Sequence, residues 1–162
     1  MAEGNIHKHL KLVAMAFLKK HCTDIVSSET KFRNIRSIAD ACGLNLKRKE
    51  IRVIEVKASK NDYLRDVKLF NLETSYFPHS TYFYIMCPYG VIDKSEVLKE
   101  LGLIYVDGND KVYIIQKPTK NTRLKTRFET TLKNAVRSIT NDLLFKFHDI
   151  NTQLQQTGMK KR

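Results

Sequence analysis

The stretch that decides the fold is residues 51–57, which read IRVIEVK. Its β-branched side chains favour a strand, and successive side chains of a strand alternate between its two faces. Ile54 and Val56 therefore point to one face, and Glu55 and Lys57 point to the other. Burying charged groups is costly unless they are paired or bind an ion. The end of this strand therefore predicts either a salt bridge or a metal-centred site.

A second acidic residue lies upstream, in the segment 36–41, which we interpret as another short extended piece. A basic turn at 46–50 separates this segment from the strand that carries Glu55, and two strands joined by a short turn form a hairpin. The hairpin places Asp40 next to Glu55, with Lys57 beside them. Two acids and one amine at the same edge of a sheet favour the metal site.

The order Asp40, Glu55, Lys57 matches the pattern D-x(n)-E-x-K, and the sequence resembles the PD-(D/E)xK nuclease superfamily. Ala39 stands where that family usually has a proline. The resemblance implies an α/β fold with a restriction-endonuclease-like core, in which a mixed central β-sheet is flanked by helices.

The resemblance extends beyond these three residues. Residues 55–66, EVKASKNDYLRD, look like the E-I-K-x-S-R-x-D-F-x-x-D signature of the MmcB-like DNA repair branch of the superfamily. In that branch the signature opens a helix and leads to an aromatic strand that ends in proline, here residues 82–88. The similarity covers roughly residues 8–90.

The family's chemistry implies a metal-dependent DNA endonuclease or repair-type nuclease that hydrolyses phosphodiester bonds. Asp40 and Glu55 would hold Mg²⁺ or Mn²⁺ with the backbone carbonyl of Val56, because hard cations prefer oxygen ligands. In related nucleases a glutamate before the Asp-bearing strand assists the metal, and Glu29 is the candidate, with an exposed loop acid as its alternative. Lys57 would orient the attacking water or stabilise the transition state.

Basic residues near the proposed site suit contact with a phosphate backbone. Ser59 is expected to cap a helix, and Lys60, Arg65 and Lys68 project from it. A second basic group spans the linker and the first half of the C-terminal helix, and it includes Arg123, Lys125 and Arg127. For both groups a solvated helix face is the alternative.

Length and charge restrict the number of domains and the kind of partner. The chain of 162 residues suits one nuclease-like domain over 1–156, followed by a basic tail at 157–162. A net charge of +12 and a pI near 9.7 indicate an anionic partner, for which we expect DNA. No run of residues predicts a membrane span or a signal peptide, so we expect a cytoplasmic protein with no membrane partner. Three cysteines without C-x-x-C spacing indicate neither a disulfide framework nor a zinc site.

The remaining pattern predicts further elements. Residues 5–21 form an amphipathic helix, in which His7 and His9 lie on different faces and are interpreted as solvated. A central strand follows at 82–87, then a short helix at 94–101 and a strand hairpin around the turn 107–110. The two strands of that hairpin are expected at 103–106 and 111–116.

A long C-terminal helix covers residues 122–155. Its apolar stripe, which includes Leu143 and Phe147, needs a cover. The cover is either the sheet or the same helix of a second subunit, and the second alternative predicts a homodimer through the C-terminal helix.

Three other functions stay open. A Holliday-junction-type resolvase of the same superfamily would cut branched but not linear duplexes. A catalytically inactive nucleic-acid-binding module would bind DNA without regard to Mg²⁺. A peripheral protein of anionic membranes fits least, because the basic residues are spread through the folded region.

Overall fold

The computed structural model describes residues 3–21, 23–32 and 37–156, and its centre is one mixed sheet of six strands. The strands lie side by side in the order of the chain. The three central strands, β3, β4 and β5, run parallel, and the pairs β1–β2, β2–β3 and β5–β6 are antiparallel. The bounds are β1 Ile25–Lys31, β2 Ile38–Asn45, β3 Glu50–Val56, β4 Tyr82–Pro88, β5 Gly102–Val106 and β6 Val112–Gln116.

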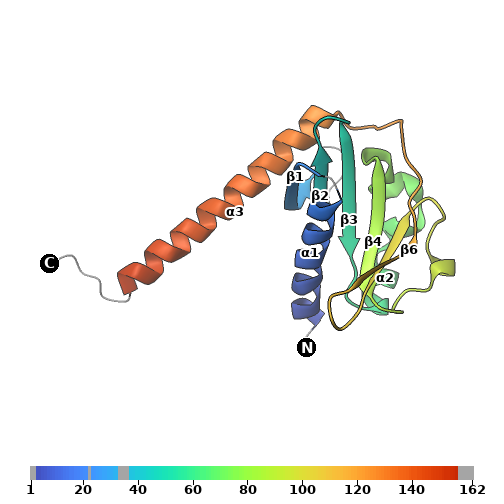
Figure 1. The fold of residues 1–162 in the computed structure, drawn as a ribbon, viewed down its shortest axis with the longest axis horizontal. Coiled ribbons are helices and arrows are strands. Elements are labelled where there is room, and N and C mark those ends of the chain that lie inside the picture. Colours follow the sequence, from blue (N-terminus) through green and yellow to red (C-terminus); the bar gives the residue numbers. More distant parts are fainter. Residues whose placement is uncertain (1–2, 22, 33–36, 157–162) are drawn as a thin grey trace.

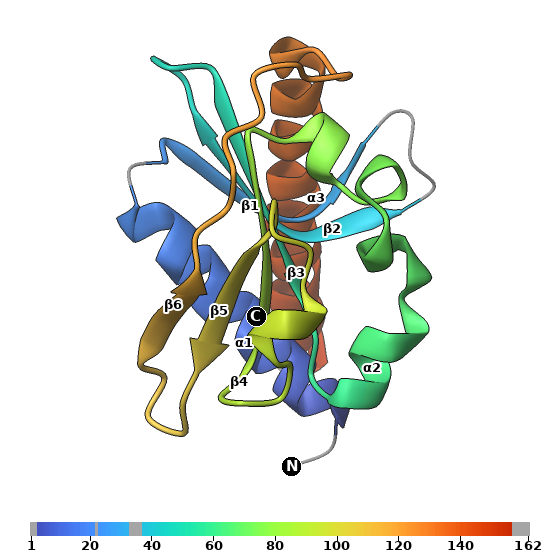
Figure 2. The same ribbon diagram turned by 90° about the vertical axis from the view of Figure 1, so that its right-hand side faces the viewer.

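Two layers cover the sheet (Figures 1 and 2). Helix α1 (Glu3–Lys20) lies on one face, where Leu10, Ala14 and Leu18 are buried. The short helix α2 (Lys60–Arg65) and the turns that follow it lie on the opposite face. β4 is buried on both faces, as its continuous apolar sequence predicts. The α/β architecture and the mixed sheet expected from the sequence are confirmed.

The hairpin predicted around the basic turn is present. β2 and β3 pair antiparallel, with Ala41 opposite Ile54. This register brings the end of β3 that carries Glu55 to the part of β2 that carries Asp40. The second hairpin, β5–β6, also forms around the predicted turn, and Asp110 there has a positive φ of 62°.

The prediction of a helix at 94–101 is wrong. Asp93 does cap a turn, with a capping box to Glu96, but the turn is a single 3-10 helix, Lys94–Glu96. Val97 then adopts extended backbone, and both Val97 and Leu101 are buried in the core. Burial of these two apolar side chains outweighs the local helical preference of the segment, because packing routinely overrides propensity.

The C-terminal helix α3 (Phe128–Gln156) starts six residues later than the sequence pattern suggests. The segment before it runs extended across the end of the sheet, where the backbone N–H groups of Asn121 and Lys125 donate to the carbonyls of Thr81 and Pro78. These hydrogen bonds hold the segment outside a helix.

The first half of α3 packs on β1, where Ala135 is fully buried and Ser138 donates to the carbonyl of Ser28. The second half projects from the body (Figure 1). All side chains from 141 to 150 are exposed, among them Leu143 at 51% and Phe147 at 62%. The sheet therefore covers only part of the apolar stripe, and pairing with a second subunit stays a prediction.

Two other expectations concern residues outside the described ranges. The basic tail at 157–162 and the thiol of Cys22 both fall there, whereas Cys42 and Cys87 are buried and reduced. Within the described ranges, no helix combines the length and the apolar character needed to cross a bilayer.

Candidate active site

Asp40 and Glu55 approach each other at the carboxyl end of β3. The Asp40 carboxylate is largely buried, and its Oδ2 accepts a hydrogen bond from the backbone N–H of Val56 at 2.9 Å. Burial raises the pKa of Glu55 above its ordinary value, and the negative charge of Asp40 raises it further. Lys57 opposes this rise, with its Nζ 3.3 Å from Glu55 Oε1. The hairpin thus brings together the three residues expected to be catalytic.

Asp66 completes the surroundings of Lys57. The Nζ of Lys57 lies 2.7 Å from Asp66 Oδ2, and the Lys57 side chain is only 7% exposed. Burial alone would lower the pKa of Lys57, but the charges of Glu55 and Asp66 outweigh it and raise that pKa. Lys57 is therefore a cation held between two carboxylates. Asp66 was missed as a site residue, although it occupies the last position of the signature at 55–66.

Helix α1 supplies two more groups that the sequence did not single out. Lys11 Nζ lies 3.3 Å from Asp40 Oδ1, and His7 Nε2 lies 3.5 Å from Asp40 Oδ2. His7 and Lys11 are four residues apart, so they share one face of the helix. The interpretation of His7 as a solvated histidine is wrong, because the packing of α1 on the sheet turns this face toward Asp40.

Glu29 is linked to Asp40 by Lys11, whose ammonium contacts both carboxylates. Glu29 Oε1 lies 3.0 Å from Lys11 Nζ, while its side chain stays 64% exposed. Its φ of 51° is a left-handed conformation that costs about 1–2 kcal/mol for a non-glycine residue. Burial alone would lower the pKa of Lys11, but the hydrogen bond to Glu29 and the charge of Asp40 raise it overall. Lys11 therefore joins two of the expected metal ligands.

One oxygen of the site lacks a partner. Glu55 Oε2 is buried and accepts no hydrogen bond from any residue that the structure describes. A buried oxygen without a partner is costly, and bound ions commonly satisfy such atoms. Asp40, Glu55 and the carbonyl of Val56 therefore suit a divalent cation held mostly by oxygen and water. No cluster of three His, Cys, Asp or Glu side chains suited to a metal occurs within the described ranges.

The expected DNA-binding residues fall into two groups. Lys60, Arg65 and Lys68 lie on α2 or in the turn after it, close in sequence to Lys57. Ser59 caps α2 as predicted, with its side chain accepting from the N–H of Asp62. Lys60 pairs with Glu96, and Arg65 Nε donates to the carbonyl of Asn61. Both Arg65 and Lys68 are exposed.

The second basic group, Arg123, Lys125 and Arg127, lies at the other end of the sheet. Lys125 pairs with Glu73, and the neighbouring Lys120 lies 3.0 Å from Glu50, the first residue of β3. Glu55 is near the opposite end of this strand, about 17 Å away at 3.3 Å per residue. The structure therefore does not bring this group to the acidic site.

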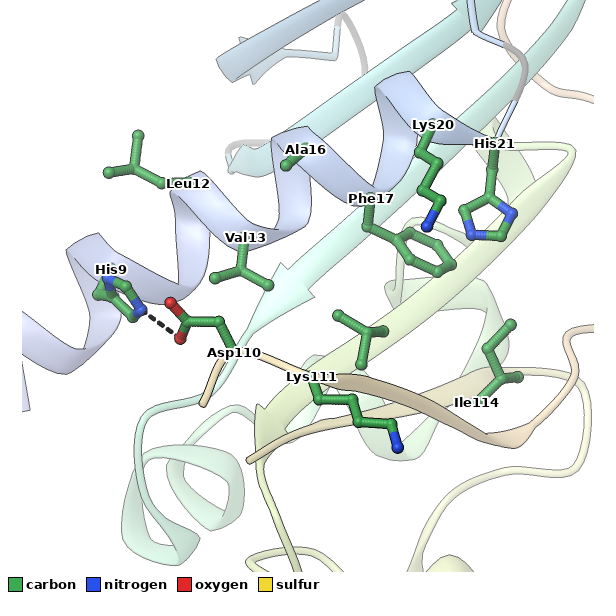
Figure 3. A pocket seen from close by; sticks show the side chains of 11 residues that line it. His9, Leu12, Val13, Ala16, Phe17, Lys20, His21, Asp110, Lys111 and Ile114 are labelled. Atoms are coloured by element: carbon green, nitrogen blue, oxygen red, sulfur yellow. Dashed lines mark hydrogen bonds and ion pairs between the residues drawn. The ribbon is translucent and has the colours of Figure 1, made fainter. Parts of the chain in front are cut away.

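The groove in Figure 3 lies elsewhere, between α1 and β6. It has a volume of about 900 Å³ and is lined by apolar side chains such as Leu12, Val13 and Phe17. His9 lies at one end, with Nε2 2.6 Å from Asp110 Oδ1. None of Asp40, Glu55 or Lys57 lines this groove, so it is separate from the acidic site.

Comparisons with known proteins address the fold. No protein-family model matches the chain, and no curated protein matches it either. A solved structure described as the SPO1766 protein of unknown function from Silicibacter pomeroyi is similar, with a TM-score of 0.63 and 21% sequence identity. The similarity covers 80% of this chain and 83% of that one. At this identity the likeness shows a shared fold and carries no function.

Proposed function

We propose that this protein is a divalent-metal-dependent DNA endonuclease of the PD-(D/E)xK type, with a restriction-endonuclease-like core and a likeness to the MmcB-like repair branch. The observation that carries the proposal is the buried, unpartnered Oε2 of Glu55 beside Asp40. The two acids come from neighbouring strands, as the sequence pattern requires. Asp40 and Glu55 would hold a hard cation, and the charge of the ion would offset the cost of burying that oxygen.

The charges around the site support a divalent ion. The raised pKa of Glu55 means that metal binding would have to release its proton; with all four carboxylates ionised, the two ammonium groups leave two negative charges uncompensated. One Mg²⁺ or Mn²⁺ would balance them. The carboxylates are Glu29, Asp40, Glu55 and Asp66, and the ammonium groups are Lys11 and Lys57.

Each residue has a distinct task in this mechanism. When bound, the metal supplies Lewis-acid activation of water and neutralises charge on the phosphate. Asp40 and Glu55 hold the ion, with the Val56 carbonyl as a further oxygen. Lys57 remains protonated, because its pKa is raised, so it stabilises negative charge on the phosphoryl oxygens and does not act as a general base. Asp66 orients its ammonium group.

DNA is the proposed partner because the chain is strongly basic. The exposed Arg65 and Lys68, next to the site, would contact the backbone that flanks the cleaved bond. Arg123 and Arg127, at the far end of β3, would contact the same duplex about five base pairs away, at about 3.4 Å per base pair. This arrangement suits a double-stranded substrate read through its backbone, without strong base preference.

The test is Mg²⁺-dependent cleavage of supercoiled, linear, single-stranded and branched DNA. We expect Asp40→Asn and Glu55→Gln to lose at least about 10²-fold in cleavage rate, since they remove metal ligands. Glu129→Gln, which changes an exposed acid paired with Lys49, should keep the native cleavage rate. Cleavage confined to branched DNA would identify a junction resolvase. Equal rates in all variants would contradict the proposal.

A second candidate is a catalytically inactive DNA-binding module. Lys11 and Lys57 already neutralise part of the charge of Asp40 and Glu55, which favours this function. Its signature would be DNA retention that is the same in Mg²⁺ and in EDTA, with no cleavage of any of the four substrates.

A further inference from the structure

The Lys11 ammonium lies beside the Asp40 carboxylate, so a metal ion at Asp40 would compete with it for the same oxygen. The two oxygens of Asp40 have different partners. Oδ2 is engaged by the N–H of Val56 and lies 3.5 Å from His7, whereas Oδ1 faces the ammonium of Lys11 at 3.3 Å. Oδ1 is therefore the oxygen through which Asp40 could bind a metal, and a cationic side chain already stands beside it.

The same ammonium also engages Glu29. The distance from Lys11 Nζ to Glu29 Oε1 is 3.0 Å, and the Lys11 side chain is 19% exposed. One cation thus bridges two carboxylates that the family resemblance assigns to the metal. Glu29 holds its side chain in this position from a left-handed backbone conformation, which is retained only where the surrounding structure enforces it.

Two cations on one carboxylate oxygen repel each other strongly in a partly buried site. Mg²⁺ binds oxygen at about 2.0–2.1 Å, so an ammonium in contact with the same oxygen would lie within a few ångströms of the metal. The lysine side chain has four flexible carbons and its charge is strongly hydrated in water, so it can leave toward solvent. A metal at this oxygen would therefore require the Lys11 ammonium to move away.

We infer that Lys11 is a built-in competitor for the divalent cation: it bridges Glu29 and Asp40 in the metal-free protein, and the metal displaces its ammonium. This inference rests on the proposed metal site. It makes Lys11 a positioning residue that sets metal affinity and keeps Asp40 and Glu29 together while no metal is bound. Once released, the ammonium stays at the rim of the site, where a DNA phosphate would attract it.

The test is direct Mn²⁺ binding, measured as free Mn²⁺ by electron paramagnetic resonance at constant ionic strength. Lys11→Met removes the charge and keeps a similar length, and we expect it to bind Mn²⁺ at least about tenfold more tightly than the native chain. Lys11→Arg keeps the charge and should stay within about threefold of native affinity. Lys8→Met, an exposed lysine on the same helix, is the matched control and should also stay within about threefold.

A second measurement needs no variant. Reductive methylation of the native protein, read by mass spectrometry, reports how accessible each lysine is. We expect Lys11 to react several-fold faster after Mn²⁺ is added, while Lys8 reacts equally fast in both conditions.

The outcomes separate the two proposals. Mn²⁺ binding of equal affinity in the native chain and in Lys11→Met, or methylation of Lys11 that ignores bound Mn²⁺, overturns the inference and leaves the metal site intact. If neither protein binds Mn²⁺, the proposed metal site fails and the inference fails with it. A purely structural salt bridge would lower stability in Lys11→Met without changing Mn²⁺ affinity, which also counts against the inference.

Discussion

The ion pair between Lys57 and Asp66 gives the sharpest test of the site's construction. Their charged atoms are 2.7 Å apart, and the side chains are only 7% and 19% exposed. Removing one partner of a buried pair costs about 3–5 kcal/mol. Lys57 keeps Glu55 as a second partner at 3.3 Å, and Asp66 has some contact with solvent, so we expect Asp66→Asn to cost about 2 kcal/mol.

A double-mutant cycle isolates this pair. The variants are Asp66→Asn, Lys57→Met and the combination, each unfolded in urea and followed by far-ultraviolet circular dichroism, because the chain has no tryptophan. We expect a coupling free energy of about 1.5–2 kcal/mol. The pair Lys49–Glu129, with both side chains 67% exposed at 3.2 Å, serves as the control and should couple by less than about 0.5 kcal/mol. If the Lys57–Asp66 coupling is as small as that of the control, the two charges are not held together as described.

Three further predictions concern other parts of the molecule. Burial lowers the pKa of His79 below 6.5, so the neutral form of the imidazole is favoured in the folded state. The free energy of unfolding should therefore fall as the pH drops below about 6.5. His79→Gln should weaken this pH dependence in urea titrations. Gly102→Ala should cost about 2–3 kcal/mol, since a Cβ there would lie 2.4 Å from the ring of the buried Tyr84; an unchanged urea midpoint would contradict this packing. If the exposed face of α3 pairs with a second copy, Leu143→Asp should convert the dimer to a monomer in light scattering. A native chain that is monomeric at high concentration would exclude this pairing.

The strands that carry the catalytic candidates could be predicted because their signals are local. Residues 51–57 are rich in β-branched side chains, which favour a strand, and the basic turn before them indicates the hairpin with Asp40. Asp66 was also within reach, since it stands in the same signature as Glu55 and Lys57. Here the sequence pattern and the packing agree.

The residues that the sequence did not single out depend on contacts between distant segments. His7 and Lys11 meet Asp40 only because α1 packs across the sheet, and the spacing within the helix says nothing about which face of the sheet it will meet. The short helix expected at 94–101 is absent because Val97 and Leu101 bury in the core along an extended path. Tertiary packing decides both features, and no pattern within either segment records it.

The projecting half of α3 has a consequence for how this helix can be observed. Helices of about 12–15 residues are marginal in water unless an apolar face is covered. Leu143, Phe147 and Ile150 are each more than half exposed, so the last turns gain little from the sheet. The ellipticity at 222 nm should therefore rise with protein concentration if a second chain covers them, and should stay constant upon dilution if the segment is helical on its own. The ellipticity of the unlabelled protein would thus report whether the projecting half of α3 associates with a second chain.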